Sequence, residues 1–194
     1  NYYQCSYFFN AHNVPKKIFN NNKLFIVIIF IVIISLIILK IVEAYNMLNV
    51  YLSGEIHSNW REEIIKLCED EGLDILFTSP VTNHEASDDC GIEILGPEEN
   101  NYWKDSKGAN INSIRTRKSI TDCDVVIVKF GEKYKQWNAA FDAGYAAALG
   151  IPIITIHDAS NQHALKEIDA ASLAVVSSPS QIVPILKYVI DGQL

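Results

Sequence analysis

The sequence is poor in sulfur and lacks the cysteine patterns of metal sites and disulfide frameworks. Its 194 residues include four cysteines and one methionine, Met47. The three cysteines downstream of Met47 are unevenly spaced and form no C-x-x-C pair, so we interpret them as free or buried thiols of a reducing compartment. No metal-ligand spacing appears among the later histidines either. We therefore predict no metal site and no cofactor; those histidines are His57, His84, His157 and His163.

Positive charge is also scarce, and the formal net charge is −7. Four lysines and one glutamate lie before Met47, so the rest of the chain carries 12 basic and 22 acidic side chains, a net charge of −10. Such a negative charge argues against a nucleic-acid polymer as the partner. It still allows a small anionic ligand that is held by a few local donors.

Residues 1–46 form an N-terminal extension rich in Asn, Ile, Phe, Tyr and Lys. The apolar run at 24–42, LFIVIIFIVIISLIILKIV, has the length of about 20 residues that a bilayer requires. One interpretation is a genuine transmembrane segment, which makes the protein membrane-anchored and allows the hypothesis of a membrane-tethered interaction protein. The other is translated leader sequence before a true start at Met47, which makes the protein cytoplasmic. A membrane partner is expected only if residues 24–42 are expressed.

From Met47 to Leu194, apolar strand-like runs alternate with amphipathic helical segments. Strands are predicted at 48–53, 75–77, 125–130, 153–156 and 173–176, with helices between them and at the C-terminus. This alternation is typical of an α/β fold. We predict a flavodoxin-like, doubly wound, five-stranded parallel sheet of order 2-1-3-4-5 with helices on both faces. Its switch point would lie between the first and third strands.

The stretch from Val81 to Asn110 is the least regular part of the domain, with Gly, Pro, Asn and Asp throughout. We predict only one short helix in it, at 87–95, and a further helix that begins at Asn110. A long irregular stretch in a compact domain is usually functional or flexible. His84 and Asp105 are its candidate ligand contacts, with solvated loop side chains or helix caps as the alternative.

Two loops meet at the predicted switch point. The first, SGEIHSNW, joins a strand to a helix, and such a turn offers backbone N–H groups and a positive helix dipole to an anion. An ordinary βα turn with an Asn59–Glu62 capping box is the alternative. The second loop, FGEKYKQWN, carries aromatic side chains that can stack on a planar base. Candidate ligand contacts in and beside the two loops are Gly54, Ile56, His57, Ser58, Arg61, Tyr134, Trp137 and Asn138.

Asp142 lies one turn into the helix that follows the third strand, near the carboxyl edge of the sheet, where open α/β sheets bind ligands. A carboxylate beside a base-stacking surface suits attack on the anomeric carbon of a nucleoside, because the transition state there is oxocarbenium-like. The alternative is an acidic residue that complements the helix dipole. Gly144 is expected to allow close approach of this helix to the sheet.

The segment DVVIVKFGEKYKQWNAAFDAGYAAALGIPIITI resembles the closing βαβ unit of the nucleoside 2-deoxyribosyltransferase-like superfamily. That superfamily has a Glu-x-Gly-(Tyr or Arg)-Ala pattern before a Leu-Gly-Lys-Pro turn, and Asp142, Gly144, Tyr145 and Ala146 match the first part. The resemblance implies that Asp142 is the nucleophile. YLSGEIHSNWRE resembles the loop that holds the 5-phosphate in the 2-deoxynucleoside 5-phosphate N-hydrolases. By that resemblance the phosphate contacts would be Gly54, Ile56, Ser58 and Arg61.

A closer resemblance, from Met47 to the C-terminus, is to the YtoQ family. It is carried by GEIHSNWREE, NHEASDD, EILG, NNYWKD, INSIRT and FGEKYKQWNAAFDAGYA. Compared with the wider superfamily, Asp142 is shorter than the usual glutamate, and KYKQWN replaces a Gly-Thr ahead of it. Arg115, Thr116 and Arg117 occupy the region where an aspartate usually faces the base.

We therefore predict a nucleoside or nucleotide N-glycosidase, or a deoxyribosyltransferase-like protein, with Asp142 as nucleophile or oxocarbenium stabiliser. The expected partner is a small-molecule nucleoside or nucleotide, and we expect a homo-oligomer. The alternative is a non-catalytic nucleotide-binding or sensing module of the same fold.

Overall fold

The computed structural model describes residues 21–132 and 136–193, and the chain divides into two units, 1–46 and 47–194. The first unit contains helix α1 (Asn21–Asn46). In the described part of the chain, no helix is both long and apolar enough to cross a membrane.

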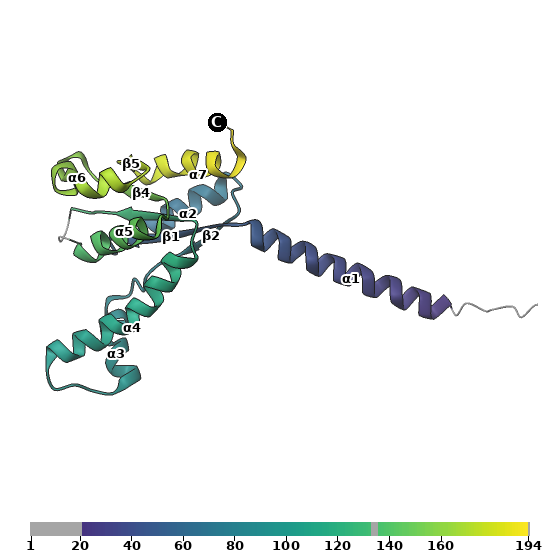
Figure 1. Cartoon of the computed structure of the whole chain (residues 1–194), viewed down its shortest axis with the longest axis horizontal. Helices are drawn as coiled ribbons and strands as arrows, with labels where there is room; N and C mark the ends of the chain where they lie inside the picture. The colour runs from purple at the N-terminus through teal and green to yellow at the C-terminus, as the bar shows by residue number, and fades with distance from the viewer. Residues whose placement is uncertain (1–20, 133–135, 194) are drawn as a thin grey trace, which may run out of the picture. The chain divides into compact units, whose positions relative to one another are not determined.

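The second unit is built on a parallel sheet whose strand order is β2-β1-β3-β4-β5 (Figure 1). This order confirms the predicted fold class. In the central pair, Val50 lies opposite Val125 and Gly54 opposite Lys129. The β-branched central strands are buried on both faces, as parallel strands between two helix layers are. The strands are β1 (Leu48–Gly54), β2 (Ile75–Thr78), β3 (Val125–Lys129), β4 (Ile153–Ile156) and β5 (Ala174–Val176).

Helices cover both faces of the sheet (Figure 1). Helices α2 (Trp60–Asp70) and α7 (Ile182–Asp191) pack on the face to which β1 contributes Val50 and Leu52. The C-terminal part of α4 (Asn101–Asp122), with α5 (Trp137–Leu149) and α6 (Gln162–Ala171), packs on the opposite face, which carries Tyr51. Because side chains alternate along a strand, Ser53 points to the same face as Tyr51. Two short 3₁₀ helices, η1 (Ala159–Asn161) and η2 (Pro179–Gln181), precede α6 and α7.

The stretch predicted to be irregular is a pair of packed helices, α3 (His84–Leu95) and the N-terminal half of α4, which projects from the sheet (Figure 1). Asn83 and Asn100 cap these helices by accepting bonds from Ala86 N and Tyr102 N. Gly91 faces Gly108 so closely that a Cβ on Gly91 would collide with the Gly108 backbone. The predicted helix at 87–95 is present and ends at Leu95, but it begins earlier, at His84, and the predicted start of the next helix at Asn110 is wrong because α4 begins at Asn101. Here the asparagines cap the two helices, and the glycines allow the helices to cross at close range.

Helix α5 approaches the sheet through small side chains. Ala139, Ala143 and Ala146 are buried against it, which brings the intervening Asp142 to the sheet edge. Gly144 is exposed with open space where its Cβ would lie, so its predicted role in close packing is wrong. Gly150 ends the helix in the left-handed conformation, φ 72°, which glycine adopts without strain.

Candidate functional site

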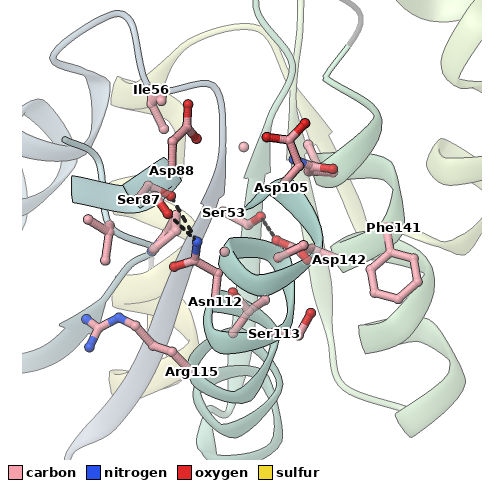
Figure 2. A pocket seen from close by; sticks show the side chains of 18 residues that line it. Ser53, Ile56, Ser87, Asp88, Asp105, Asn112, Ser113, Arg115, Phe141 and Asp142 are labelled. Atoms are coloured by element: carbon pink, nitrogen blue, oxygen red, sulfur yellow. Dashed lines mark hydrogen bonds between the residues drawn. The ribbon is translucent and has the colours of Figure 1, made fainter. Parts of the chain in front are cut away.

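A cavity of about 530 Å³ opens at the carboxyl edge of the sheet (Figure 2). Its walls come from the end of β1 and from α3, α4 and α5, so it lies at the switch point between β1 and β3. Five of the residues proposed from the sequence line it, and the structure therefore brings these together: Gly54, Ile56, Asp105, Asn138 and Asp142.

Asp142 is held by a hydrogen bond to the sheet. The hydroxyl of the fully buried Ser53 donates to Asp142 Oδ2 over 2.6 Å. Burial raises the pKa of Asp142 from 3.8 to about 6, against the opposing effect of the Ser53 hydroxyl, which stabilises the ionised form. The second carboxylate oxygen, Oδ1, has no hydrogen-bond partner among the described residues. Asp142 thus combines a fixed orientation with an oxygen free to meet a ligand.

Tyr51 lies beneath this carboxylate, two residues before Ser53 on the same side of β1. Burial raises the pKa of Tyr51 to about 12, and the charge of Asp142 adds to the shift. The polar side chain of Thr116 acts in the opposite direction and lowers the pKa of Tyr51. Even so, no group in the described part of the chain has hydrogen-bond geometry to the buried Tyr51 hydroxyl. A protonated hydroxyl without an acceptor is costly to bury, which is consistent with a place in a binding site.

The loop after β1 begins with a glycine that the geometry requires. Gly54 has φ 106°, and a Cβ at this position would collide with the backbone of Lys129 on β3. Glu55 N donates to Lys129 O over 3.0 Å, so the loop is tied to the neighbouring strand. This close approach of two backbones lets Gly54 and Ile56 line the cavity.

Arg61 is buried, and the carbonyl oxygens of the preceding strand and loop occupy its donors. Nε donates to Leu52 O over 3.0 Å, Nη1 to Glu55 O over 2.6 Å and Nη2 to Gly54 O over 3.0 Å. The guanidinium also stacks 4.6 Å from the centre of the Trp60 ring. Through these hydrogen bonds Arg61 holds the loop in place.

The rest of this loop is closed on itself as well. The Glu55 carboxylate accepts from His57 N over 2.7 Å and from Ser58 Oγ over 2.8 Å, and Lys129 Nζ lies 3.8 Å away. Burial opposes the charge on Glu55, but the Ser58 and His57 hydrogen bonds and Lys129 outweigh it and lower the pKa of this carboxyl. An ionised glutamate inside the loop disfavours a phosphate there. His57 and Ser58 are exposed and do not line the cavity.

The other proposed residues are less central to the cavity. Trp137 begins α5 and is 75% exposed, outside the cavity lining, whereas the next residue, Asn138, lines it. His84 is an exposed residue of α3 whose Nδ1 lies 2.9 Å from Asp88 Oδ2. Tyr134 lies outside the described residues. Asn59 precedes α2 without a side-chain cap bond, so the predicted capping box is absent; its ψ of 24° is not the extended conformation that such a cap needs.

Several cavity residues were not proposed as contacts from the sequence. Ser53 is the last residue of the strand predicted at 48–53 and reads as part of the core. Asp88 and Asn112 fell in or beside the region taken as irregular, and Arg115 and Thr116 lie in the region where the wider superfamily usually has an aspartate that faces the base. Asn112 Nδ2 donates to Ser87 O over 2.9 Å and fastens α4 to α3. Among the described residues, no group of three His, Cys, Asp or Glu side chains could hold a metal ion.

The strand order and the switch-point cavity define a doubly wound α/β protein with a ligand site at its carboxyl edge. A conserved protein from Enterococcus faecalis V583 has a similar structure, with a TM-score of 0.51 at 14% identity, over 74% of this chain and 99% of that one. A 2-deoxyribosyltransferase from the psychrotolerant bacterium Bacillus psychrosaccharolyticus also matches, with a TM-score of 0.45 at 15% identity, over 70% of this chain and 90% of that one.

Sequence comparison identifies the family. The model described as nucleoside 2-deoxyribosyltransferase YtoQ matches residues 51–190. The uncharacterized protein YtoQ of Bacillus subtilis (strain 168) is 46% identical over 144 residues, which are 74% of this chain and 97% of that protein. The chain therefore belongs to the nucleoside 2-deoxyribosyltransferase YtoQ family, as its motifs predict.

Proposed function

We propose that this protein cleaves the N-glycosidic bond of a nucleoside and transfers the sugar to a second base or to water. The observation that carries the proposal is the Asp142 carboxylate, held by Ser53 at the edge of a cavity of about 530 Å³. That volume lies within the range of small-molecule sites, about 300–1,000 Å³. Membership in a family described as nucleoside 2-deoxyribosyltransferases supports the choice of substrate.

The chemistry assigns one oxygen of Asp142 to each task. Oδ2 accepts the Ser53 bond, and Oδ1 faces the anomeric carbon. As the bond from C1′ to the base nitrogen breaks, its electron pair leaves with the base. Oδ1 then bonds to C1′ or stabilises the oxocarbenium ion. The departing base takes a proton from solvent. A second base or water then attacks C1′ and gives up a proton to solvent, and any bond between C1′ and Oδ1 breaks, which returns Asp142 as a carboxylate.

Tyr51 would support this step as a positioning residue. Its high pKa keeps the hydroxyl protonated at neutral pH. Among the charged groups that shift this pKa, Asp142 has the largest effect. A protonated hydroxyl cannot compete with Asp142 as a nucleophile. Tyr51 is fully buried and does not line the cavity, so it would act on Asp142 from within the core.

The charges around the cavity favour a substrate without a phosphate. Among the residues that the structure describes, its lining includes the carboxyl groups of Asp88, Asp105 and Asp142 and one cationic side chain, Arg115. The nearby cations Arg61 and Lys129 are bound to carbonyl oxygens and to the Glu55–Ser58 pair. A 5′-phosphate would meet more negative than positive charge here. We therefore prefer a nucleoside to a nucleotide.

The test is to incubate the protein with 2′-deoxynucleosides, ribonucleosides, their 5′-monophosphates and NAD, and to measure released base by chromatography. We expect release from deoxynucleosides, and a loss of at least about a thousandfold in Asp142→Ala, as for removal of a nucleophile. Asp74→Ala is the matched control, because Asp74 is an exposed aspartate just before β2, at the other end of the strands.

Two results would contradict the proposal. Base release that Asp142→Ala leaves unchanged would remove Asp142 from the chemistry. Thermal stabilisation by nucleosides or nucleotides without any release, equal in the original protein and in Asp142→Ala, would instead indicate a non-catalytic binding or sensing module.

A further inference from the structure

The charged groups of the cavity are separated along its length. Figure 2 shows the carboxyl groups of Asp88 and Asp105 towards one end and the Arg115 guanidinium towards the other, with the Ser53–Asp142 hydrogen bond between them. Asp88 belongs to α3, whereas Asp105 and Arg115 belong to α4, three turns apart on one helix. The helical hairpin therefore presents a negative end and a positive end to any ligand that reaches Asp142.

Arg115 keeps most of its hydrogen-bonding capacity. In the described part of the chain its one hydrogen bond is long, 3.4 Å from Nη2 to the Ser79 carbonyl oxygen. Its charge also acts to lower the pKa of the buried Tyr51 hydroxyl. By contrast, Arg117 lies 5.8 Å over the Tyr145 ring and does not line the cavity. Arg115 is thus the cation that can donate to a ligand in this site.

Cleavage of a nucleoside separates charge in a definite direction. The sugar becomes positive as C1′ loses the electron pair of the glycosidic bond, and the base becomes negative as its nitrogen receives that pair. Groups that oppose the developing charges stabilise the transition state. The carboxylates therefore match the sugar, and the guanidinium matches the departing base.

We infer that the base end of the site lies at Arg115, and that Arg115 selects bases carrying a carbonyl oxygen beside a ring nitrogen, such as hypoxanthine and guanine. This inference rests on the proposed function. The guanidinium presents parallel N–H donors, which pair with two adjacent acceptors such as O6 and N7 of an oxopurine. Adenine offers N7 next to an amino group, which is a donor and cannot accept from arginine. Arg115 donates to the carbonyl oxygen that takes up negative charge when the bond to C1′ breaks.

The experiment compares base release by the full chain from 2′-deoxyinosine and 2′-deoxyadenosine, which differ in this acceptor. We expect release from deoxyinosine to be faster by about tenfold or more. Arg115→Gln should slow the deoxyinosine reaction about tenfold or more and change the deoxyadenosine reaction much less. Arg115→Lys should recover only part of the loss, because lysine keeps the charge without the paired donors. Arg117→Gln removes the same charge from the same helix and should leave both rates unchanged.

A binding measurement separates this inference from the proposed reaction. In calorimetric titrations of the free bases, hypoxanthine should bind more tightly than adenine, and Arg115→Gln should abolish the difference. If no nucleoside releases base but this difference holds, the proposed reaction fails and the base end at Arg115 stands. If bases are released with no preference, or Arg115→Gln behaves like Arg117→Gln, the inference is overturned while the reaction stands. Failure to bind either base, without release, overturns both.

Discussion

The two sides of the switch point use polar residues in opposite ways. On the β1–α2 side, the Ser58 hydroxyl donates to the Glu55 carboxylate, and Arg61 donates to the backbone carbonyl oxygens of the same loop. On the α4–α5 side, Arg115 and Asp142 keep atoms that the described residues leave without partners. A polar residue next to a ligand site is therefore not evidence of a contact by itself. Its hydrogen-bond partners decide whether it builds the wall or meets the ligand.

Arg61 gives the largest test of this comparison. Arg61→Met should lower the free energy of unfolding by about 3–5 kcal/mol, because three carbonyl oxygens lose a charged donor in a buried place. Urea denaturation measures the change. Arg117→Met is the control, since Arg117 is exposed, and should cost much less.

The comparison would break if Arg61→Met kept its stability and lost nucleoside binding. Arg61 would then contact the ligand, as the resemblance to the phosphate-binding loop predicts, and both sides of the switch point would act on the substrate.

The pH dependence of Asp142 is the next effect in size. With a pKa of about 6, base release should fall about tenfold per pH unit below 6, because only the ionised carboxylate can act. Stability changes in the opposite direction. Between 3.8 and about 6 the folded state binds the extra proton, so stability falls as pH rises through this window.

Asp142→Asn should remove that slope and make the protein about 2 kcal/mol more stable at pH 7, after allowance for partial exposure of the carboxyl. Thermal denaturation from pH 3.5 to 7.5 measures both proteins. A variant that is less stable than the original at pH 7 would show that the Ser53 bond outweighs the cost of burying the charge.

The smallest effect is expected on the self-bonded loop. Ser58→Ala removes a hydroxyl that bonds to Glu55 and receives Lys129, outside the cavity. The rate of base release should change by less than about threefold. Loss of a hydrogen bond to a charged group within the site would cost about 1.5–3 kcal/mol and would lower the rate much more. If the rate of base release fell more than tenfold while the free energy of unfolding stayed unchanged, Ser58 would belong with the residues that meet the ligand.

The sheet could be predicted from the sequence because its signals are local. Buried β-branched runs separated by helical segments determine the strand order with few alternatives. The α3–α4 hairpin could not be predicted in the same way. Asn83, Asn100, Gly91 and Gly108 favour loops in isolation, and they cap and pack helices only once the two helices have met.

The residues of the candidate site also differ in whether the sequence could predict them. Asp142 and Gly54 stand at positions that the βα order fixes, so the sequence places them at the carboxyl edge. Ser53 and Tyr51 look like ordinary members of a buried strand. Only the position of α5 in the fold brings Asp142 close to them. The binding of Arg61 to carbonyl oxygens depends on how the chain folds back over β1, which residue type and spacing do not encode.

The Gly91–Gly108 crossing has a consequence for engineering the range of substrates. Gly108 lines the cavity, and a Cβ there would press on the Asp88 backbone of the facing helix. The width of the compartment is thus set by the absence of two side chains. Each methyl group added at the crossing would act as a spacer, moving Asp88 away from Asp105 and Arg115, and would make room for bulkier ligands without touching the reacting carboxylate.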